Sequence, residues 1–213
     1  MPGTEKKPTY DEAFWEQLWS KTLREQGDKV AQRPPNASLV SIASSLTPGR
    51  ALDAGCGHGA ETLWLAAHGW SVTAVDFSAS ALTKGRALAD AIGADVAARI
   101  DWQQGDLATW PVPRGHFDLV LCIFVHIAGS VPDFVRRMAE AVAPNGTLLL
   151  VGYRPNDNAP TGSPVPSQTQ VSLEEARSAL EPKSWQIVMS EERPRTHGPA
   201  GVDAIIVARR QLT

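Results

Sequence analysis

The stretch Arg50–Ser78, RALDAGCGHGAETLWLAAHGWSVTAVDFS, predicts a strand, a glycine turn, a helix and a second strand in direct succession. The first strand is apolar apart from Asp53. The glycines of the turn have no Cβ, so the chain turns sharply and its backbone can approach a ligand closely. The helix ends at Gly69, and the second strand ends at the carboxylate of Asp76. A glycine turn that opens a helix, with an acid about 20 residues on, is typical of a nucleotide-cofactor site.

The composition is typical of one globular domain. The chain has 213 residues, of which 43% are hydrophobic, enough for one sizeable core and too few for two ordinary domains. A net charge of -3 gives no global field that would recruit nucleic acid or a membrane surface. Residues 1–15 have no apolar core after their lysines, so they do not resemble a secretory signal, and no run is long enough to cross a bilayer.

Cysteine and histidine usage indicates the compartment and the absence of a metal centre. Cys56 lies in the glycine turn and Cys122 in an apolar run, and both are most simply reduced thiols. No spacing of cysteine and histidine indicates a metal site. We therefore expect a cytoplasmic, single-domain protein without a bound metal.

The N-terminal region predicts helices. Residues 1–9 are expected to form a tail, and apolar residues then recur at helical spacing from Tyr10 to Glu25, with Trp15 and Trp19 one turn apart. Two interpretations of this amphipathic helix are open. Periodicity alone favours an aromatic face packed on the core, and the alternative is a lid over a cofactor. A QRPPN break and a second helix, 37–46, precede the first strand.

Strands and helices continue to alternate after Asp76. The run 117–124 is apolar apart from one acid, as expected for a central strand buried on both faces. This alternation implies right-handed crossovers and a parallel, doubly wound sheet. The expected elements are helices at 78–92 and 132–143 and strands at 99–104, 117–124 and 147–151.

The C-terminal part has a different pattern. Residues 153–171 are rich in Pro, Asn, Ser and Gly without periodicity, as in a functional lid or a disordered segment. Ser172 begins a short helix, with Glu175 as its capping-box partner. Two strands, 185–190 and 202–209, are expected to close the chain as a hairpin at one edge of the sheet.

Two classes of cofactor compete for the glycine turn. Gly55, Gly57 and Ala60 satisfy the loose dinucleotide pattern G-x-G-x-x-G/A, which is weak evidence by itself. Against it stands Asp53, because a carboxylate beside a bound pyrophosphate would repel it in a partly dehydrated site. The same carboxylate suits a cofactor that carries an ammonium and a sulfonium, such as S-adenosylmethionine.

Two further acids extend this pattern. Asp76 ends the second strand and can accept hydrogen bonds from both hydroxyls of a ribose. Asp106 follows the third strand, where it can accept from an adenine amino group. With Asp53 they lie at the carboxyl ends of parallel strands, where ligands bind in such sheets. Each acid alone is as consistent with a cap on a helix or turn, but together they favour S-adenosylmethionine.

The motifs L-D-A-G-C-G-H-G, V-T-A-V-D-F-S, Q-G-D-L, F-D-L-V-L-C and A-P-N-G-T-L-L-L, in this order, resemble those of class I S-adenosylmethionine-dependent methyltransferases over residues 50–152. The resemblance implies an α/β fold: one Rossmann-like, doubly wound sheet of seven mostly parallel strands with an antiparallel last strand, plus the N-terminal helices. It also implies the cofactor contacts. These are Asp53, Gly55, Cys56 and Gly57 with Ile123 and Phe124 at the methionine part, Asp76 at the ribose, and Phe77, Asp106 and Leu107 at the adenine.

A narrower similarity concerns the N-terminal helix. The pattern Trp15-x-x-x-Trp19, and Gly-x-x-x-Glu-x-x-Trp from Gly57 to Trp64, are similar to thiopurine, thiol and tellurite-resistance methyltransferases. In that group the N-terminal aromatic helix covers the cofactor. This implies that Trp15 and Trp19 belong to the cofactor site. The glycine turn departs from the group, because it is the generic G-C-G-H-G, so the group's substrate is not carried over.

The expected organisation is therefore one domain over 1–213. It comprises an N-terminal helical lid at 1–46, a cofactor-binding core at 50–152, a variable loop at 153–171, and a closing helix and hairpin at 172–210.

His126 is the best candidate for a catalytic base. It lies just past the fourth strand, towards the expected acceptor site, and a histidine that titrates near neutrality can take a proton in the transition state. The alternative is a histidine of the pocket wall. A base is needed only for a protonated acceptor, since positioning supplies much of the acceleration. His58, within the turn, is expected to point to solvent or to the helix start.

The sequence thus predicts an S-adenosylmethionine-dependent methyltransferase that acts on a small thiol, hydroxyl, amine or chalcogen oxyanion. An NAD(P)-dependent oxidoreductase and a non-catalytic binding module are the alternatives. No basic tail favours a nucleic-acid acceptor. Tyr153 and Arg154 are substrate candidates by position only. The run Arg193-Pro194-Arg195 either contacts an acidic acceptor or, as we favour, forms a solvated hairpin tip.

Overall fold

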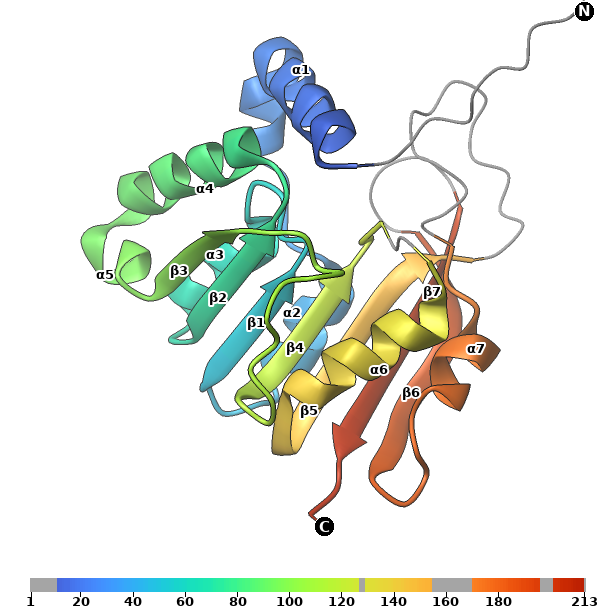
Figure 1. Cartoon of the computed structure of the whole chain (residues 1–213). Coiled ribbons are helices and arrows are strands. Elements are labelled where there is room, and N and C mark those ends of the chain that lie inside the picture. The colour runs from blue at the N-terminus through green and yellow to red at the C-terminus, as the bar shows by residue number, and fades with distance from the viewer. Residues whose placement is uncertain (1–10, 127–128, 155–169, 196–200, 213) are drawn as a thin grey trace, which may run out of the picture.

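The computed structural model describes residues 11–126, 129–154, 170–195 and 201–212, which form a seven-stranded sheet flanked by helices (Figure 1). The strand order is β3-β2-β1-β4-β5-β7-β6. The five strands from β3 to β5 are parallel, and β7 is antiparallel to both β5 and β6. The predicted fold class is confirmed. The strands are β1 (Arg50–Ala54), β2 (Ser71–Asp76), β3 (Ile100–Gln104), β4 (Phe117–Ile123), β5 (Val142–Tyr153), β6 (Trp185–Pro194) and β7 (Val202–Arg210).

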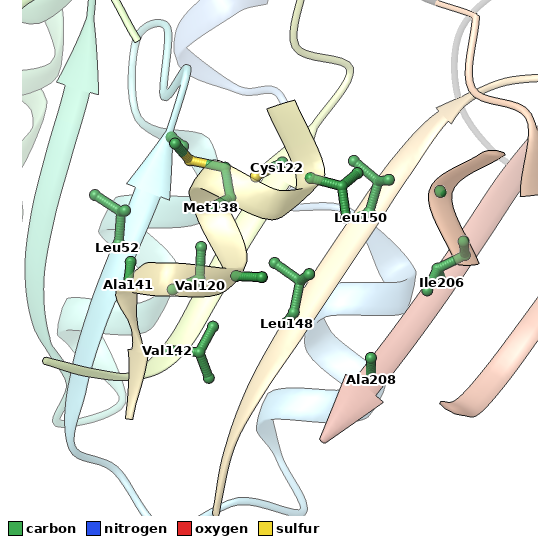
Figure 2. Close-up of a cluster of buried hydrophobic side chains, with 14 of the residues drawn as sticks. Leu52, Val120, Cys122, Met138, Ala141, Val142, Leu148, Leu150, Ile206 and Ala208 are labelled. Carbon is green, nitrogen blue, oxygen red and sulfur yellow. The ribbon is translucent and has the colours of Figure 1, made fainter. Parts of the chain in front are cut away.

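Helices cover both faces of the sheet and bury it. On one face α2, α3 and α4 cover the strands, and α6 and α7 cover the other. Figure 2 shows the core beneath α6, where Met138 lies over the strands that carry Leu52 and Val120. All three side chains are fully buried, and each contributes about 1.5–3 kcal/mol by leaving water. The helices are α1 (Glu12–Ala31), α2 (Ala37–Ala43), α3 (Ala60–Ala67), α4 (Ala79–Ile92), α5 (Ala94–Ala97), α6 (Val131–Ala141) and α7 (Leu173–Ser178).

Local capping places the helix starts where the sequence predicts them. The side chain of Ser78 accepts a hydrogen bond from the backbone N–H of Ala81 and caps α4. Ser172 accepts from the backbone N–H of Glu175 and caps α7. Each of these bonds satisfies a donor that the first turn of a helix leaves unpaired.

Several boundaries differ from the expectation. Helix α1 continues past Glu25 to Ala31, although Gln26 departs from helical geometry and kinks it. Strand β5 begins at Val142 instead of 147, because Val142 pairs with Phe117 ahead of an irregularity in the ladder. Strand β6 runs to Pro194 and β7 to Arg210, and they form the edge hairpin.

The two N-terminal helices lie in different places. Helix α1 lies beyond the carboxyl ends of the parallel strands (Figure 1). Helix α2 instead packs on the sheet, where Leu39 and Ala43 are buried. Only α1 is therefore positioned to cover a site at that edge. Among the described helices, none has the length and apolar character needed to cross a membrane.

Candidate functional site

A cavity of about 500 Å³ opens at the carboxyl ends of β1 to β4, and Trp15 and Trp19 of α1 line it. Its volume lies within the range of small-molecule sites, about 300–1,000 Å³. The cavity brings together almost every residue that the sequence assigns to the cofactor or to catalysis. These are Trp15, Trp19, Gly55, Cys56, Gly57, Asp76, Phe77, Asp106, Leu107, Ile123, Phe124 and His126.

The glycine turn forms the floor of the cavity. Gly55 has φ 78° and Gly57 has φ 54°, a left-handed backbone that side chains disfavour. A Cβ on Gly55 would lie 2.9 Å from Cγ2 of Val125. The turn is held by the backbone N–H of Gly55, which donates to the carbonyl of Val75 at 2.8 Å. Glycine is thus required both by the backbone angles and by the close packing around the turn.

Asp76 connects the turn to the start of α4. Its Oδ2 accepts from the backbone N–H of Gly57 at 2.8 Å, and its Oδ1 accepts from the backbone N–H of Ser78 at 2.9 Å. Burial raises the pKa of Asp76, and these two bonds act in the opposite direction. Each carboxylate oxygen has lone pairs left to accept a ligand hydroxyl.

Asp53 does not line the cavity, whereas the sequence predicted that it contacts the methionine part of the cofactor. Its side chain is 2% exposed, accepts from Oγ1 of Thr62 at 2.6 Å, and is not among the residues that line the cavity. Burial, and then the charge of Glu61, raise its pKa well above the ordinary range. Asp53 thus lies behind the cavity wall, and its charge still acts on Cys56, which lines the cavity.

Glu61 is the acid that lines the cavity in its place. Its Oε1 accepts from the backbone N–H of Asn36 at 3.1 Å, and burial raises its pKa. The sequence contained a signal for it, because Glu61 is the acid of the Gly-x-x-x-Glu-x-x-Trp pattern. Periodicity and spacing could not show that it faces a ligand.

The two tryptophans of α1 lie against histidines at the cavity. Trp15 lies 5.4 Å from His126 and Trp19 lies 5.6 Å from His58, between ring centroids. The Nε1 atom of Trp15 is buried and has no hydrogen-bond acceptor among the described residues. A buried donor without an acceptor costs about 1–3 kcal/mol, so a ligand acceptor here would relieve that cost.

The expectation that His58 points to solvent was wrong. Its side chain is 5% exposed and lines the cavity instead of pointing to solvent. Burial, and then the charge of Arg33, lower the pKa of His58 to about 4. The imidazole is therefore neutral at pH 7. Helix α1, which packs over the turn, excludes water from it, and this contact is not visible in the local sequence.

The loop after β3 is fixed by a hydrogen bond within the loop and by another from α6. Oδ1 of Asp106 accepts from the backbone N–H of Ala108 at 2.7 Å. The guanidinium of Arg137 donates from Nε to the carbonyl of Leu107 at 2.9 Å. Arg137, which the sequence did not single out, also lines the cavity. The loop is thereby fixed against α6.

The far end of the cavity lies where β4, β5 and the hairpin meet. Strand β4 ends at Ile123 and not at Phe124, because Phe124 has φ 53° and turns the chain away. A left-handed non-glycine residue is sparsely populated and marks many functional sites. The rings of Phe124 and Tyr153 lie 4.8 Å apart between centroids.

Arg195 also belongs to this end, which corrects the expectation of a solvated hairpin tip for this residue, whereas residues 193–194 are exposed as expected. The side chain of Arg195 is 8% exposed, and Nε donates to Oδ1 of Asp203 at 2.8 Å. The guanidinium carbon lies 4.4 Å from the ring centroid of Tyr153. Burial raises the pKa of Tyr153, and the charges of Arg195 and Arg33 oppose that shift. Both arginines line the cavity.

Some expectations fall outside the described residues. The tail at 1–9 and nearly all of the variable loop, 155–169, are not described. Within the described ranges, no group of three or more His, Cys, Asp or Glu is arranged to hold a metal ion.

Comparison with known proteins agrees with this geometry. Residues 51–146 match the family model described as a methyltransferase domain. Thiocyanate methyltransferase 1 of Brassica oleracea is 32% identical over 190 residues, which cover 87% of this chain and 79% of that protein. The doubly wound sheet and the cavity at its carboxyl edge form the arrangement in which such sheets bind ligands. The relatives make this more specific: the chain belongs to the class I S-adenosylmethionine-dependent methyltransferases.

Two solved structures share the fold. TehB from Haemophilus influenzae has a TM-score of 0.68 at 19% identity, covering 92% of this chain and 67% of that one. The cyclase SpnF has a TM-score of 0.71 at 17% identity, covering 97% of this chain and 99% of that one. At such identities the likeness shows the fold alone.

Proposed function

We propose that this protein transfers the methyl group of S-adenosylmethionine to a small anionic acceptor. The observation that carries the proposal is the single cavity that joins the glycine turn and Asp76 to a far end lined by Tyr153 and Arg195. The first part suits a nucleoside cofactor, and the second part suits an acceptor. A cytoplasmic location is part of the proposal, since both cysteines, Cys56 and Cys122, are free and buried thiols.

The residues that line the cavity indicate which of them would contact the cofactor. We assign the ribose to Asp76, whose carboxylate is held in place by two backbone donors. In this proposal Glu61 takes the ammonium of the methionine part, and Asp53 supports the turn from behind through Thr62. The remaining contacts are Gly55, Cys56, Gly57, Ile123 and Phe124 at the methionine part, Phe77, Asp106 and Leu107 at the adenine, and Trp15 and Trp19 as the cover.

S-adenosylmethionine, when bound, supplies a methyl group on a positively charged sulfur. The residues at the far end then have to hold a nucleophile in line and keep water away. Phe124 and Tyr153 provide apolar walls, and Arg195 provides a buried positive charge. His126, which lines the same cavity, would accept a proton from an acceptor that arrives as a neutral thiol.

Two observations support an anionic acceptor over a cationic one. Arg195 and Arg33 both lie close enough to Tyr153 to act on its titration, and both line the cavity. These two charges favour an anion over a protonated amine, and the charge of Asp203, which pairs with Arg195, offsets them in part. In addition, the relative from Brassica oleracea is named for thiocyanate, a small anion.

A turnover screen tests the proposal. Purified protein with S-adenosylmethionine is offered thiocyanate, hydrosulfide, an aromatic thiol, a phenol and a primary amine, and S-adenosylhomocysteine is measured. We expect turnover with the anions and the thiol and little with the amine. Turnover confined to the amine would overturn the anion assignment. Binding of the cofactor without any turnover would favour the non-catalytic module, and binding of NAD(P) in its place would favour the oxidoreductase.

His126→Ala separates the two roles of that histidine. As a base, it should slow turnover of the neutral thiol and leave thiocyanate unaffected, because thiocyanate has no proton to lose. Equal loss with both acceptors would assign His126 to the cavity wall only.

A further inference from the structure

Glu16 places a carboxylate of α1 against the first turn of α4. Its Oε2 accepts from Oγ of Ser78 at 2.7 Å and from the backbone N–H of Ser80 at 3.2 Å. Its Oε1 accepts from Oγ of Ser20 at 3.1 Å and from the hydroxyl of Ser80. Two of these three serines belong to the start of α4, so the contact joins two helices that are distant in the sequence.

The physical basis is the unsatisfied start of a helix. Helix α4 has 14 residues, and the first N–H groups of a helix carry the positive end of its dipole. Ser78 caps this end by accepting from Ala81, while its own O–H donates to Glu16. The hydroxyl of Ser80, and then that of Ser78, lower the pKa of Glu16 to about 2. Glu16 is therefore ionised at every pH at which the protein would be used.

Apolar packing covers α1 only in part. No residue of the helix is fully buried, and Trp15 and Trp19 are half-buried. The polar contact of Glu16 adds to this packing. The first two-thirds of α1, before the kink at Gln26, contain both Glu16 and the tryptophans that cover the cavity.

The anchor leads directly to the proposed ribose carboxylate. Ser78, which donates its hydroxyl to Glu16, donates its backbone N–H to Asp76 at 2.9 Å. Asp76 in turn accepts from the backbone N–H of Gly57. A continuous chain of hydrogen bonds thus runs from α1 through Ser78 and Asp76 to the glycine turn.

A second link runs in parallel. Nε2 of Gln104 donates to Oε1 of Glu12 at 2.9 Å and to the carbonyl of Phe77 at 3.1 Å. Both links from α1 therefore reach the segment Asp76–Ser78.

We propose that Glu16 is a positioning residue, which docks α1 over the cavity and, through Ser78, orients Asp76 for the cofactor. This inference rests on the proposed function. Glu16 is not among the residues that line the cavity, so it acts through others. Its loss should weaken cofactor binding much more than it slows methyl transfer at saturating cofactor.

Glu16→Ala and Glu16→Gln test this role, with Glu25→Gln as the control. Glu25 lies on the same helix with an exposed side chain, so its change removes the same charge without the anchor. We expect the KM for S-adenosylmethionine to rise about tenfold or more in both Glu16 variants, with kcat within about threefold, as for loss of a charge-assisted hydrogen-bond network. The control should match the wild type. An unchanged KM in both variants would overturn the inference.

Hydrogen exchange of the unliganded protein separates this inference from the proposed function. Loss of the anchor should speed exchange of the α1 amides, while β1 and β4 keep their protection. Unchanged exchange of α1 in both variants would overturn the anchor. Faster exchange in a protein that binds no S-adenosylmethionine would instead uphold the anchor and reject the proposed function. Retained protection in β1 and β4 also shows that the variants are folded.

Discussion

Trp19 packs directly on Gly57: a Cβ added to Gly57 would lie 2.6 Å from Cζ2 of Trp19. The cover of the cavity and its floor are thus in contact, although Trp19 and Gly57 are 38 residues apart in the sequence. Access to the cavity therefore depends on how α1 sits on the turn.

Gly57→Ala should disturb both elements. The alanine would strain a backbone at φ 54° and displace Trp19, so we expect cofactor affinity to fall at least tenfold. Calorimetric titration with S-adenosylhomocysteine measures this. Gly27→Ala is the matched control, because a Cβ there meets nothing within 4 Å. Equal affinity of the two variants would contradict the close fit.

Trp15→Phe removes the buried Nε1 donor and keeps most of the aromatic surface. The unliganded protein should lose little stability or gain some, since a donor without an acceptor is costly to bury. Affinity for the ligand that uses this donor should fall about tenfold, equivalent to about 1.4 kcal/mol. Thermal unfolding with and without S-adenosylhomocysteine gives both quantities. If the ligand stabilises the variant as much as it stabilises the wild type, Nε1 of Trp15 does not donate a hydrogen bond to the ligand.

Asp76→Asn tests the ribose assignment without a change of size. The amide keeps one acceptor oxygen, but its NH₂ group meets one of the backbone donors of Gly57 or Ser78. We expect cofactor affinity to fall by about tenfold to a hundredfold, as for loss of charge-assisted hydrogen bonds. Asp101→Asn, an exposed acid of β3, is the control. Cofactor affinity at the wild-type level would reject the assignment of Asp76.

Arg195→Met should change acceptor use and leave cofactor affinity within about threefold. Methionine keeps apolar contact with Tyr153, but it removes the buried positive charge and leaves Asp203 without this ion pair. We expect the KM for thiocyanate to rise at least tenfold, while a neutral thiol is affected less. The double variant Arg195→Met with Asp203→Asn also removes the negative charge that the single variant leaves without Arg195. A similar loss for charged and neutral acceptors in the double variant would argue against an anion site.

His58 should make the folded protein sensitive to mild acid. Its folded pKa is about 4, whereas an unfolded histidine has a pKa of about 6.5. Between these values the unfolded state binds a proton that the folded state does not, so stability falls as pH drops from 6.5 to 4. The slope from this group reaches at most about 1.4 kcal/mol per pH unit.

Chemical denaturation of the wild type and His58→Asn across pH 4–7 checks this dependence. The variant should have a smaller slope. His68→Asn, a change at an exposed histidine, should keep the wild-type slope. The raised pKa values of Asp53 and Glu61 act in the opposite direction, so the difference between variants is the informative quantity. Identical slopes for all three proteins would show that His58 is not the group responsible.

The core of the fold was predictable from the sequence because its signals are local. These signals are the apolar strands, the glycine turn and the capping serines Ser78 and Ser172. Each of them determines the structure of residues that are close by in the sequence. The placement of Asp76 and Asp106 at one edge followed from strand alternation alone, since parallel strands bring their carboxyl ends together.

Tertiary structure alone decided which side chains reach the cavity. Asp53 and Glu61 are both acids near the glycine turn, but the hydrogen bond from Thr62 holds Asp53 behind the wall and leaves Glu61 on the cavity. Arg195 follows a polar segment that resembles a solvated tip, and only the pairing of β6 with β7 beside β5 buries it against Tyr153.

The docking of α1 could likewise not be predicted from local sequence patterns. The sequence determined an amphipathic helix with two tryptophans, and periodicity could not state what its face would meet. The docking depends on the hydrogen bonds of Glu16 to the start of α4 and on the packing of Trp19 against Gly57. Both are contacts between segments that are distant in the sequence. The sequence by itself therefore determined the sheet and the edge where ligands bind. Long-range packing and hydrogen bonding decided which residues form the walls of the site and what covers it.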